Sequence, residues 1–207
     1  MKKAFAVFAA GILLSVVSYG ADACLDETTI GALKNLPVDG CLSGDKLFSN
    51  FTSNIADDAD VFVINEPGGG AVPDNHGWDV SPISGFGPGT YTFGYTISVD
   101  TTNFPNMRIS QAQLDAQAGL AAVYTVSKAI NDGTWLLETS NTGTAVSTNI
   151  VPWATSLTIM DTLVVTQGPI LGISNTFAQS AVPEPATLAL FGAGLLALGL
   201  GRRFRKQ

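Results

Sequence analysis

Histidine, cysteine and basic residues are scarce in this 207-residue chain, and each shortage excludes a kind of site. One histidine and two cysteines are too few for the usual zinc site of four nitrogen and sulfur ligands. Residues 24–182 contain fifteen acidic residues and only four basic ones, so their net charge is −11. An acidic surface repels phosphate backbones, and we therefore expect no nucleic-acid partner.

The chain also lacks the short motifs of the common catalytic classes. His76 lies in the stretch VPDNHGWD with no G-x-S-x-G nearby, so we interpret it as a solvent-exposed loop residue and not as part of a Ser-His-Asp triad. The run EPGGGAVP is not followed by a Lys-Ser/Thr pair, and no GxGxxG is present, which argues against phosphate and dinucleotide sites. We expect no enzyme activity and no cofactor.

The densest group of carboxylates is Asp57, Asp58 and Asp60 in IADDADVFV. Three carboxylates can bind calcium together with backbone carbonyls, but this spacing does not match an EF-hand loop, which also needs a glycine and a final glutamate. We interpret the group as a solvated turn before a strand and expect no metal there. The three residues remain the candidates for a calcium site.

The N-terminal sequence MKKAFAVFAAGILLSVVSYGADAC has the layout of a secretory signal peptide. Two lysines open it, the stretch 4–17 is apolar on all sides, and small residues follow at Ala21 and Ala23. This order of charged, apolar and small residues is typical of chains handled by the translocon and signal peptidase. We predict a signal peptide over residues 1–23, with cleavage after Ala23 or after Gly20.

Export to an oxidising compartment favours a disulfide between Cys24 and Cys41. The loop that it closes is short, and the cross-link is worth about 3 kcal/mol in the chain-entropy model. Two independent thiols are the alternative. Acylation of Cys24 is disfavoured, since Ala21 and Asp22 stand where lipoprotein signals carry an aliphatic and a small residue.

The C-terminal segment VPEPATLALFGAGLLALGLGRRFRKQ combines two prolines, an apolar run and a basic tail. As a helix the run 186–201 would measure about 24 Å, against about 30 Å for the hydrocarbon core of a bilayer. The tail that follows contains Arg202, Arg203, Arg205 and Lys206. Basic residues reach the headgroups and stay on the cytoplasmic side, so we predict a transmembrane helix with the preceding domain outside.

Pro183, Glu184 and Pro185, with the apolar run and basic tail after them, resemble the PEP-CTERM sorting signal of Gram-negative bacteria. The resemblance covers residues 182–207. It implies that an exosortase-type transpeptidase recognises the tripeptide, and that the tail is cut off as the protein, held transiently in the inner membrane, reaches the surface. The segment is also known as an ice-binding protein C-terminal motif, a label that does not establish ice binding.

The segment 24–181 is rich in strand patterns. The stretch TYTFGYTISV (90–99) places its aromatic and aliphatic residues on one face and its threonines on the other. The stretch 156–166 is similar, with a phase shift near Asp161 that indicates a β-bulge. Shorter candidate strands are 46–52, 60–64, 134–140 and 171–179, and 119–130 fits a strand or a helix, with VYTV favouring a strand.

Gly- and Pro-rich clusters at 65–77 and 81–89 and the turn at 131–133 separate these strands. The chain is therefore predicted to be mainly β: an antiparallel β-sandwich domain flanked by an N-terminal signal peptide and a C-terminal transmembrane helix.

The stretch GCLSGDKLFSNFT (40–52) is similar to the opening of the mature domain in many PEP-CTERM proteins. The matching residues are Cys41, Gly44, Asp45, Lys46, Phe48, Ser49, Asn50 and Phe51, and the later YTV (124–126) and FAQ (177–179) fit the same pattern. The resemblance implies an exported β-rich domain without an assigned activity. From the residues themselves we expect Gly44 and Asp45 to form a turn, and Phe48 and Phe51 to lie in the core or at its edge.

Two groups of side chains keep a binding function open. Trp78, Trp135 and Trp153 could stack on sugars, but they are scattered along the chain, so we expect them to be buried in the core. Thr90, Thr92 and Thr96 hint at a threonine face, although they form no repeat.

We therefore expect an exported, non-catalytic protein of the cell surface or extracellular matrix, associated with exopolysaccharide or biofilm. Its expected partners are the translocon, the signal peptidase, the exosortase, the inner membrane transiently, and exopolysaccharide. One alternative is a carbohydrate- or ice-binding adhesion module. The other is a secreted hydrolase that uses acidic residues such as Asp58 or Asp60.

Overall fold

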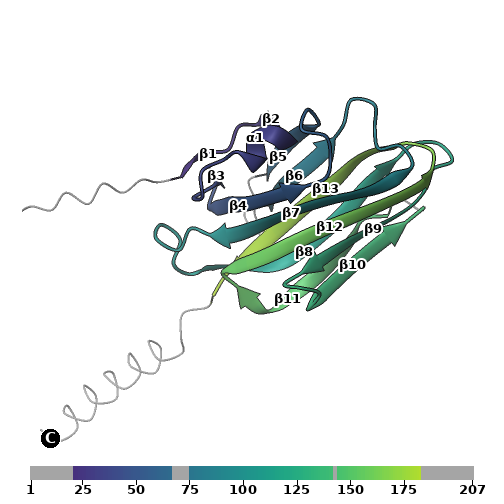
Figure 1. The fold of residues 1–207 in the computed structure, drawn as a ribbon. Helices are drawn as coiled ribbons and strands as arrows, with labels where there is room; N and C mark the ends of the chain where they lie inside the picture. Colours follow the sequence, from purple (N-terminus) through teal and green to yellow (C-terminus); the bar gives the residue numbers. More distant parts are fainter. Residues whose placement is uncertain (1–20, 67–74, 142–143, 183–207) are drawn as a thin grey trace, which may run out of the picture.

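The computed structural model describes residues 21–66, 75–141 and 144–182, which form two packed β-sheets and one short helix (Figure 1). The strands are β1 (Asp22–Ala23), β2 (Glu27–Thr29), β3 (Cys41–Ser43), β4 (Lys46–Ser53), β5 (Asp60–Glu66), β6 (Asn75–Ser81), β7 (Gly89–Val99), β8 (Met107–Ala118), β9 (Val123–Ile130), β10 (Trp135–Ser140), β11 (Val146–Ala154), β12 (Ser156–Gln167) and β13 (Ile170–Ala181). The helix α1 (Ile30–Lys34) lies between β2 and β3.

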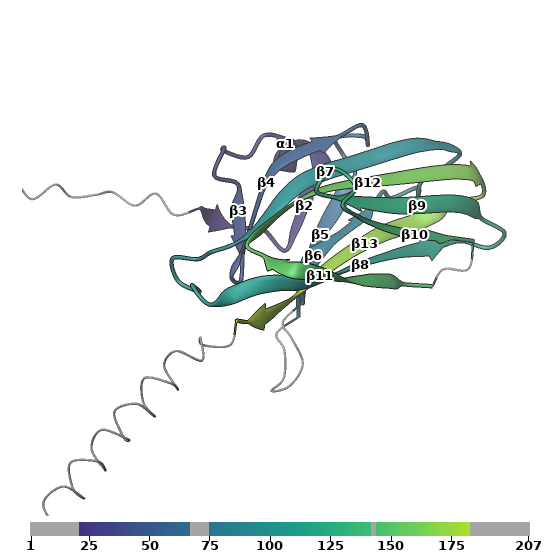
Figure 2. The ribbon, with the colours of Figure 1, turned by 90° about the horizontal axis from the view of Figure 1, so that it is seen from below.

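The two sheets form the layers of a sandwich, as the two perpendicular views show (Figures 1 and 2). The seven-stranded sheet has the order β1-β3-β4-β7-β12-β9-β10, and the six-stranded sheet has the order β11-β8-β13-β6-β5-β2. Strands β1 and β3 are parallel, and the long central strands pair antiparallel. The predicted mainly β, sandwich-like fold is thus confirmed for the described part of the chain.

The core lies between the sheets and is rich in aromatic rings. Tyr95 of β7 meets Phe177 of β13 edge-on, with ring centroids 6.3 Å apart. Phe48 of β4 meets Trp78 of β6 in the same way at 4.9 Å. The alternation predicted for β7 is confirmed, because its inward residues from Phe93 onwards are all buried. These contacts join strands of opposite sheets, so the aromatic residues hold the layers together.

The predicted disulfide between Cys24 and Cys41 is present, with the two Cα atoms 4.8 Å apart. It fastens the segment around β1 to the edge of the seven-stranded sheet. The backbone N–H of Cys24 also donates to the carbonyl of Leu42, at 2.8 Å. Acylation of Cys24 is incompatible with this bonded cysteine.

Residues 1–20 and 183–207 lie outside the described residues, and so do most of the predicted signal peptide (1–23) and the predicted transmembrane helix (186–201). Among the residues that the structure does describe, no helix has the length and apolar character needed to cross a membrane. Both segments therefore remain predictions.

The predicted bulge near Asp161 is wrong. Strand β12 pairs with β7 without interruption from Ser156 to Val165, and Asp161 points into the core between Ile159 and Leu163. The alternation continues because a buried lysine on the neighbouring strand forms an ion pair with this carboxylate, as described below. The ambiguous stretch 119–130 contains strand β9, as the sequence favoured.

Three long strands were not predicted. Strand β8 was missed because alanines occupy two of its four buried positions and because its pairing with β13 shifts register, so that no clean alternation shows in the sequence. Strand β11 is irregular in the same way, with a register shift against β8. Strand β6 lies partly inside the stretch 65–77 that we predicted to be a turn.

Candidate functional site

The sorting motif follows the folded domain directly. Strand β13 ends at Ala181, and the backbone N–H of Val182 donates to the carbonyl of Asn106, at 2.7 Å. Pro183, Glu184 and Pro185 come next and lie outside the described residues, as do the basic residues Arg202, Arg203, Arg205 and Lys206. The structure thus places the start of the motif beside a central strand of the six-stranded sheet.

Two buried polar clusters lie within the sandwich. The first, which we name the Lys46 cluster, consists of Asp45, Lys46, His76 and Gln179. The Lys46 ammonium donates to Asp45 Oδ1 at 2.5 Å and to the side-chain oxygen of Gln179. His76 Nε2 lies 3.4 Å from the same carboxylate oxygen of Asp45. All four side chains are buried, so the cluster balances its charge internally, as a buried ion pair requires.

The interpretation of His76 as an exposed loop residue is wrong. His76 lies on strand β6 and is only 3% exposed. Its ring packs against Gly44, where an added Cβ would come within 2.3 Å of the ring. The predicted turn at Gly44 and Asp45 is confirmed, and it aims the Asp45 carboxylate inward at His76. These contacts hold the turn between β3 and β4 against strand β6.

The second group, the Lys128 cluster, consists of Lys128 on β9, Asp161 on β12 and Asn175 on β13. The Lys128 ammonium lies 3.0 Å from Asp161 Oδ1 and donates to Asn175 Oδ1. The rings of Phe177 and Tyr95 cover it, with centroids 5.1 Å and 6.0 Å from Nζ. The cluster spans the core, since Lys128 and Asp161 belong to the seven-stranded sheet and Asn175 to the other.

Burial changes the protonation equilibria of the Lys128 cluster. Loss of solvent lowers the pKa of Lys128, an effect that the charge of Asp161 opposes. Loss of solvent likewise raises the pKa of Asp161, opposed by Lys128 and by a hydrogen bond from Asn175. The pKa of the buried Tyr95 phenol is also raised, by burial and then by the nearby Asp161. Burial therefore reduces the preference for the charged forms of both the lysine and the aspartate.

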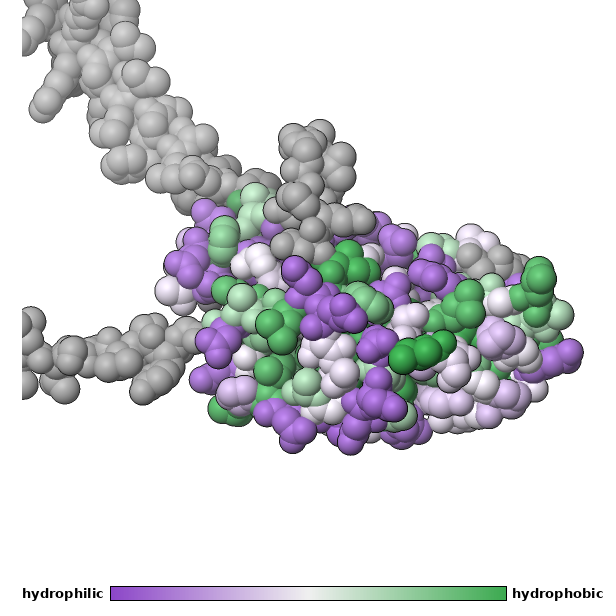
Figure 3. Space-filling view, turned by 90° about the horizontal axis from the view of Figure 1, so that it is seen from above, coloured by the Kyte–Doolittle hydropathy of each residue, from purple (hydrophilic) through white to green (hydrophobic). Residues whose placement is uncertain are grey.

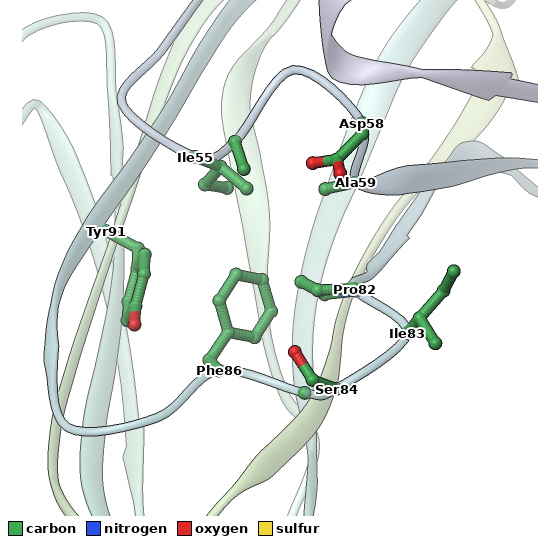
Figure 4. A pocket seen from close by; sticks show the side chains of 10 residues that line it. Ile55, Asp58, Ala59, Pro82, Ile83, Ser84, Phe86 and Tyr91 are labelled. Carbon is green, nitrogen blue, oxygen red and sulfur yellow. The ribbon is translucent and has the colours of Figure 1, made fainter.

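The three predicted metal candidates do not converge. Asp57 pairs with the ammonium of Lys34 at 2.7 Å on the surface, whereas Asp60 opens strand β5. Asp58 lines a cleft, as Figure 4 shows. Within residues 21–66, 75–141 and 144–182, no three histidine, cysteine, aspartate or glutamate side chains lie close enough together to hold a metal ion.

That cleft has a volume of about 400 Å³ and lies between the loop before β5 and the loop that joins β6 to β7 (Figure 4). Its walls are largely apolar, with Phe86 and Tyr91 in ring contact at 4.9 Å. Asp58 is the only carboxylate among its lining residues. Glycoside hydrolysis ordinarily uses two carboxyl groups, and the described lining of this cleft supplies one.

The outer side of the seven-stranded sheet carries an uncharged surface rich in hydroxyl groups. We name it the hydroxyl face and define it by the outward hydroxyl residues of three adjacent strands, Thr90, Thr92, Thr96 and Ser98 of β7, Ser156, Thr158, Thr162 and Thr166 of β12, and Thr125 and Ser127 of β9. The exposed side chains of Met160 and Val164 on β12 lie among them. Thr92 pairs with Thr162 and Thr96 with Thr158 across the strands. The predicted threonine face therefore exists, but it is assembled across strands and not along one.

The aromatic and apolar surface is otherwise dispersed. Trp78 is fully buried, as expected, and Trp135 packs against the core. Trp153 is 41% exposed, so the prediction that it would be buried is wrong. On the face shown in Figure 3, hydrophobic residues are scattered among hydrophilic ones.

Comparison with known proteins identifies the C-terminal segment. Residues 181–206 match the family model of the PEP-CTERM protein-sorting motif, which confirms the resemblance found in the sequence. The match covers the motif and leaves the β domain unassigned. No curated protein sequence matches the chain.

Several solved structures are similar at low identity. TmCBM61 in complex with beta-1,4-galactotriose has 9% identity and a TM-score of 0.35, covering 65% of this chain and 88% of that one. The family 11 carbohydrate-binding module from Clostridium thermocellum has 9% identity and a TM-score of 0.27, covering 78% and 100%. The acetyl xylan esterase Est2A from Butyrivibrio proteoclasticus has 14% identity and a TM-score of 0.24, covering 65% and 34%. Likenesses this distant do not bear on what the chain binds or whether it is an enzyme.

Proposed function

We propose that this chain is an exported, non-catalytic protein of the cell surface or extracellular matrix, sorted and processed through its PEP-CTERM motif. The match of residues 181–206 to that motif carries the proposal. The motif implies an exosortase as the processing partner, and export with transient anchoring in the membrane. We propose that the protein finally resides in a biofilm, associated with exopolysaccharide.

The layout of the domain is consistent with cleavage at the motif. The last described strand ends at Ala181, so a cut beyond Pro185 would leave every strand of the sandwich intact. The disulfide between Cys24 and Cys41 suits an oxidising compartment outside the cytoplasm. Processing would therefore release a folded, cross-linked domain.

The test is the intact mass of the protein recovered from the surface of a host that has an exosortase. We expect the wild-type protein to lack the residues beyond the motif. Replacing Pro183, Glu184 and Pro185 together by alanine should preserve the tail and keep the protein in the membrane fraction. Thr187→Ser, which leaves the tripeptide untouched, serves as the matched control. Surface protein that retains residues 186–207 would refute processing at this motif.

A second candidate function, binding of a neutral polysaccharide, is favoured by the hydroxyl face. Threonine and serine hydroxyls both donate and accept hydrogen bonds, as sugar hydroxyls do. The outward residues of β7 from 90 to 98, of β12 from 156 to 166 and of β9 from 125 to 129 include no charged side chain, so no charge has to be desolvated on contact. A sheet surface also holds these groups in fixed rows.

Binding at this face is tested by retention on matrix polysaccharide. The double variant Thr92→Lys/Thr162→Lys should lose retention, because it places two cations in the middle of the face. Gln113→Lys on β8, on the outer side of the other sheet, should retain it. Thermal hysteresis measured on the wild-type protein, the double variant and Gln113→Lys tests whether ice is the ligand instead. Equal retention of all three would exclude the hydroxyl face as the binding surface.

A further inference from the structure

We propose that Lys128 and Asn175 form an intramolecular amide (isopeptide) bond that covalently joins the two sheets, with Asp161 as the catalytic acid and base. The proposal rests on the contacts within the Lys128 cluster. A bond at this place would link strand β9 of the seven-stranded sheet to strand β13 of the six-stranded sheet. It would act in addition to the disulfide, which cross-links only the edge of one sheet.

The reacting groups are already in contact. The nitrogen Nζ of Lys128 hydrogen-bonds the side-chain oxygen of Asn175, so the amide carbon, which is one bond away from that oxygen, lies next to the amine. Asp161 Oδ1 is 3.0 Å from the same nitrogen. The side-chain amide of Asn175 also lies close enough to Asp161 to oppose the rise in the pKa of its carboxyl. The carboxyl group thus lies beside both the nucleophile and the leaving group, as general acid–base catalysis requires.

The register of the strands enforces this arrangement. Asp161 is directly opposite Lys128 in the β12–β9 pairing, and both side chains point inward. Asn175 comes from the opposite layer, on a strand held between β8 and β6. All three side chains are at most 1% exposed. Groups held in contact by three fixed strands lose little further freedom in the reaction, which makes an otherwise slow amide exchange feasible.

The surroundings favour the reactive protonation states. An amine attacks only when it is neutral, and an acid is needed to protonate the leaving amide nitrogen. Loss of solvent around these fully buried side chains disfavours an ammonium and a carboxylate. Transfer of one proton from Lys128 to Asp161 gives the neutral amine and the carboxylic acid together. No other group has to supply that proton.

The reaction balances without any co-reactant. Lys128 Nζ forms a bond to the Asn175 side-chain carbon while Asp161 hydrogen-bonds the developing oxyanion. Asp161, which already holds the proton from the lysine, then delivers it to the amide nitrogen of Asn175, and the resulting carboxylate takes a proton from Nζ. The carbon–nitrogen bond to that nitrogen breaks and ammonia leaves. One amine and one primary amide become one secondary amide and ammonia, and nothing is oxidised or reduced.

The Lys46 cluster has similar groups but a different arrangement. Asp45 precedes Lys46 in the sequence and contacts His76 as well as the lysine. Asp45 is therefore shared between the lysine and a third side chain that is neither the nucleophile nor the acceptor. The acceptor there is Gln179, whose side chain has one more rotatable bond than that of an asparagine. We therefore place the bond at Lys128 alone and use Lys46 as the internal comparison.

The test is the intact mass of the purified full chain, measured after denaturation. The mass should fall below the value of the disulfide-bonded sequence by one ammonia. Digestion with trypsin and a glutamate-specific protease should then leave a branched peptide, because Glu138 is a cleavage point between Lys128 and Asn175. The linked Lys128 should also resist trypsin. A wild-type mass without the loss, or a loss located at other residues, overturns the proposal.

Variants separate the roles within the cluster. Lys128→Met and Asn175→Ala should each restore the full mass, and Asp161→Asn should restore it while leaving both reacting groups in place. Lys46→Met should keep the loss of ammonia. If Lys46→Met restores the full mass and Lys128→Met does not, the bond lies at the other cluster and the proposal is wrong. If Asp161→Asn still loses ammonia, Asp161 is not the catalyst. The wild-type mass decides the main point even if a variant does not fold.

Discussion

Lys46 on β4 donates a hydrogen bond to Gln179 on β13, which lies 133 residues later in the chain and in the opposite sheet. This contact joins the two stretches DKLFSNF and FAQ. Both belong to the sequence pattern that resembles the mature domain of PEP-CTERM proteins. The aromatic residues of both stretches pack in the core around it, since Phe48 and Phe177 are fully buried. The shared pattern thus includes residues that meet in one cross-sheet contact.

Loss of the Lys46 charge should destabilise the protein strongly. The substitution Lys46→Met leaves Asp45 buried beside His76 without its lysine partner, and breaking a buried ion pair in this way costs about 3–5 kcal/mol. The measurement is the free energy of unfolding in denaturant. The matched control is Lys34→Met, which breaks the exposed ion pair with Asp57 and should cost less than about 1 kcal/mol. Equal effects of the two substitutions would contradict the role assigned to the Lys46 cluster.

The disulfide should stabilise the folded domain by constraining the unfolded chain. Replacing Cys24 and Cys41 together by serine should lower the free energy of unfolding by about 3 kcal/mol, as expected for a short loop. Reductant should have a similar effect on the wild-type protein, measured by the denaturation midpoint. Reductant should leave the double variant unchanged, and a shift there would show that its effect has another cause.

Gly77 should tolerate no side chain. A Cβ on Gly77 of β6 would lie 1.6 Å from the backbone oxygen of Asn175 on β13, so Gly77→Ala must push two central strands apart. We expect a loss of about 3 kcal/mol in the free energy of unfolding, at the upper end for overpacking. Gly87→Ala is the control, because a Cβ there would have nothing within 4 Å. Its expected change is within about 0.5 kcal/mol, as for other surface substitutions.

The half-buried Asp79 should make stability depend on pH. Burial raises the pKa of its carboxyl, a hydrogen bond from Ser174 opposes this, and Asp115 adds to it. Because the folded protein then holds the proton more tightly than the unfolded chain, the free energy of unfolding falls as pH rises from the unfolded pKa through the folded one. Asp79→Asn should therefore gain a little stability relative to wild type at neutral pH.

The measurement for Asp79 is a series of denaturation curves from acidic to neutral pH. Below the ordinary aspartate pKa both proteins carry a neutral group at this position, so the advantage of Asp79→Asn should disappear there. Asp100→Asn should show the opposite dependence, since hydrogen bonds from Asn103 lower the pKa of that exposed carboxyl. An advantage of Asp79→Asn that does not change with pH would contradict the assignment.

Local pattern misled us where a residue type has two common uses. The prolines and glycines before His76 led us to predict a loop that runs to Gly77. Strand β6 instead begins at Asn75, and Gly77 is a glycine because two strands approach each other closely there. Asp161 predicted a bulge because a carboxylate rarely points into a core. Its partner Lys128 lies 33 positions earlier, on a strand whose register only the folded sheet defines.

The strand periods, the disulfide and the sorting motif could all be found in the sequence. Each depends on neighbouring residues or on a few residue types that have one common use, such as the paired cysteines of an exported chain. The two polar clusters and the hydroxyl face depended on tertiary structure, since each combines side chains from two or three strands far apart in the chain. Whether a lysine or a threonine is buried or exposed depends on the strand beside it and the sheet across from it. The pairing of strands therefore decided which polar residues lie in the core and which form the surface.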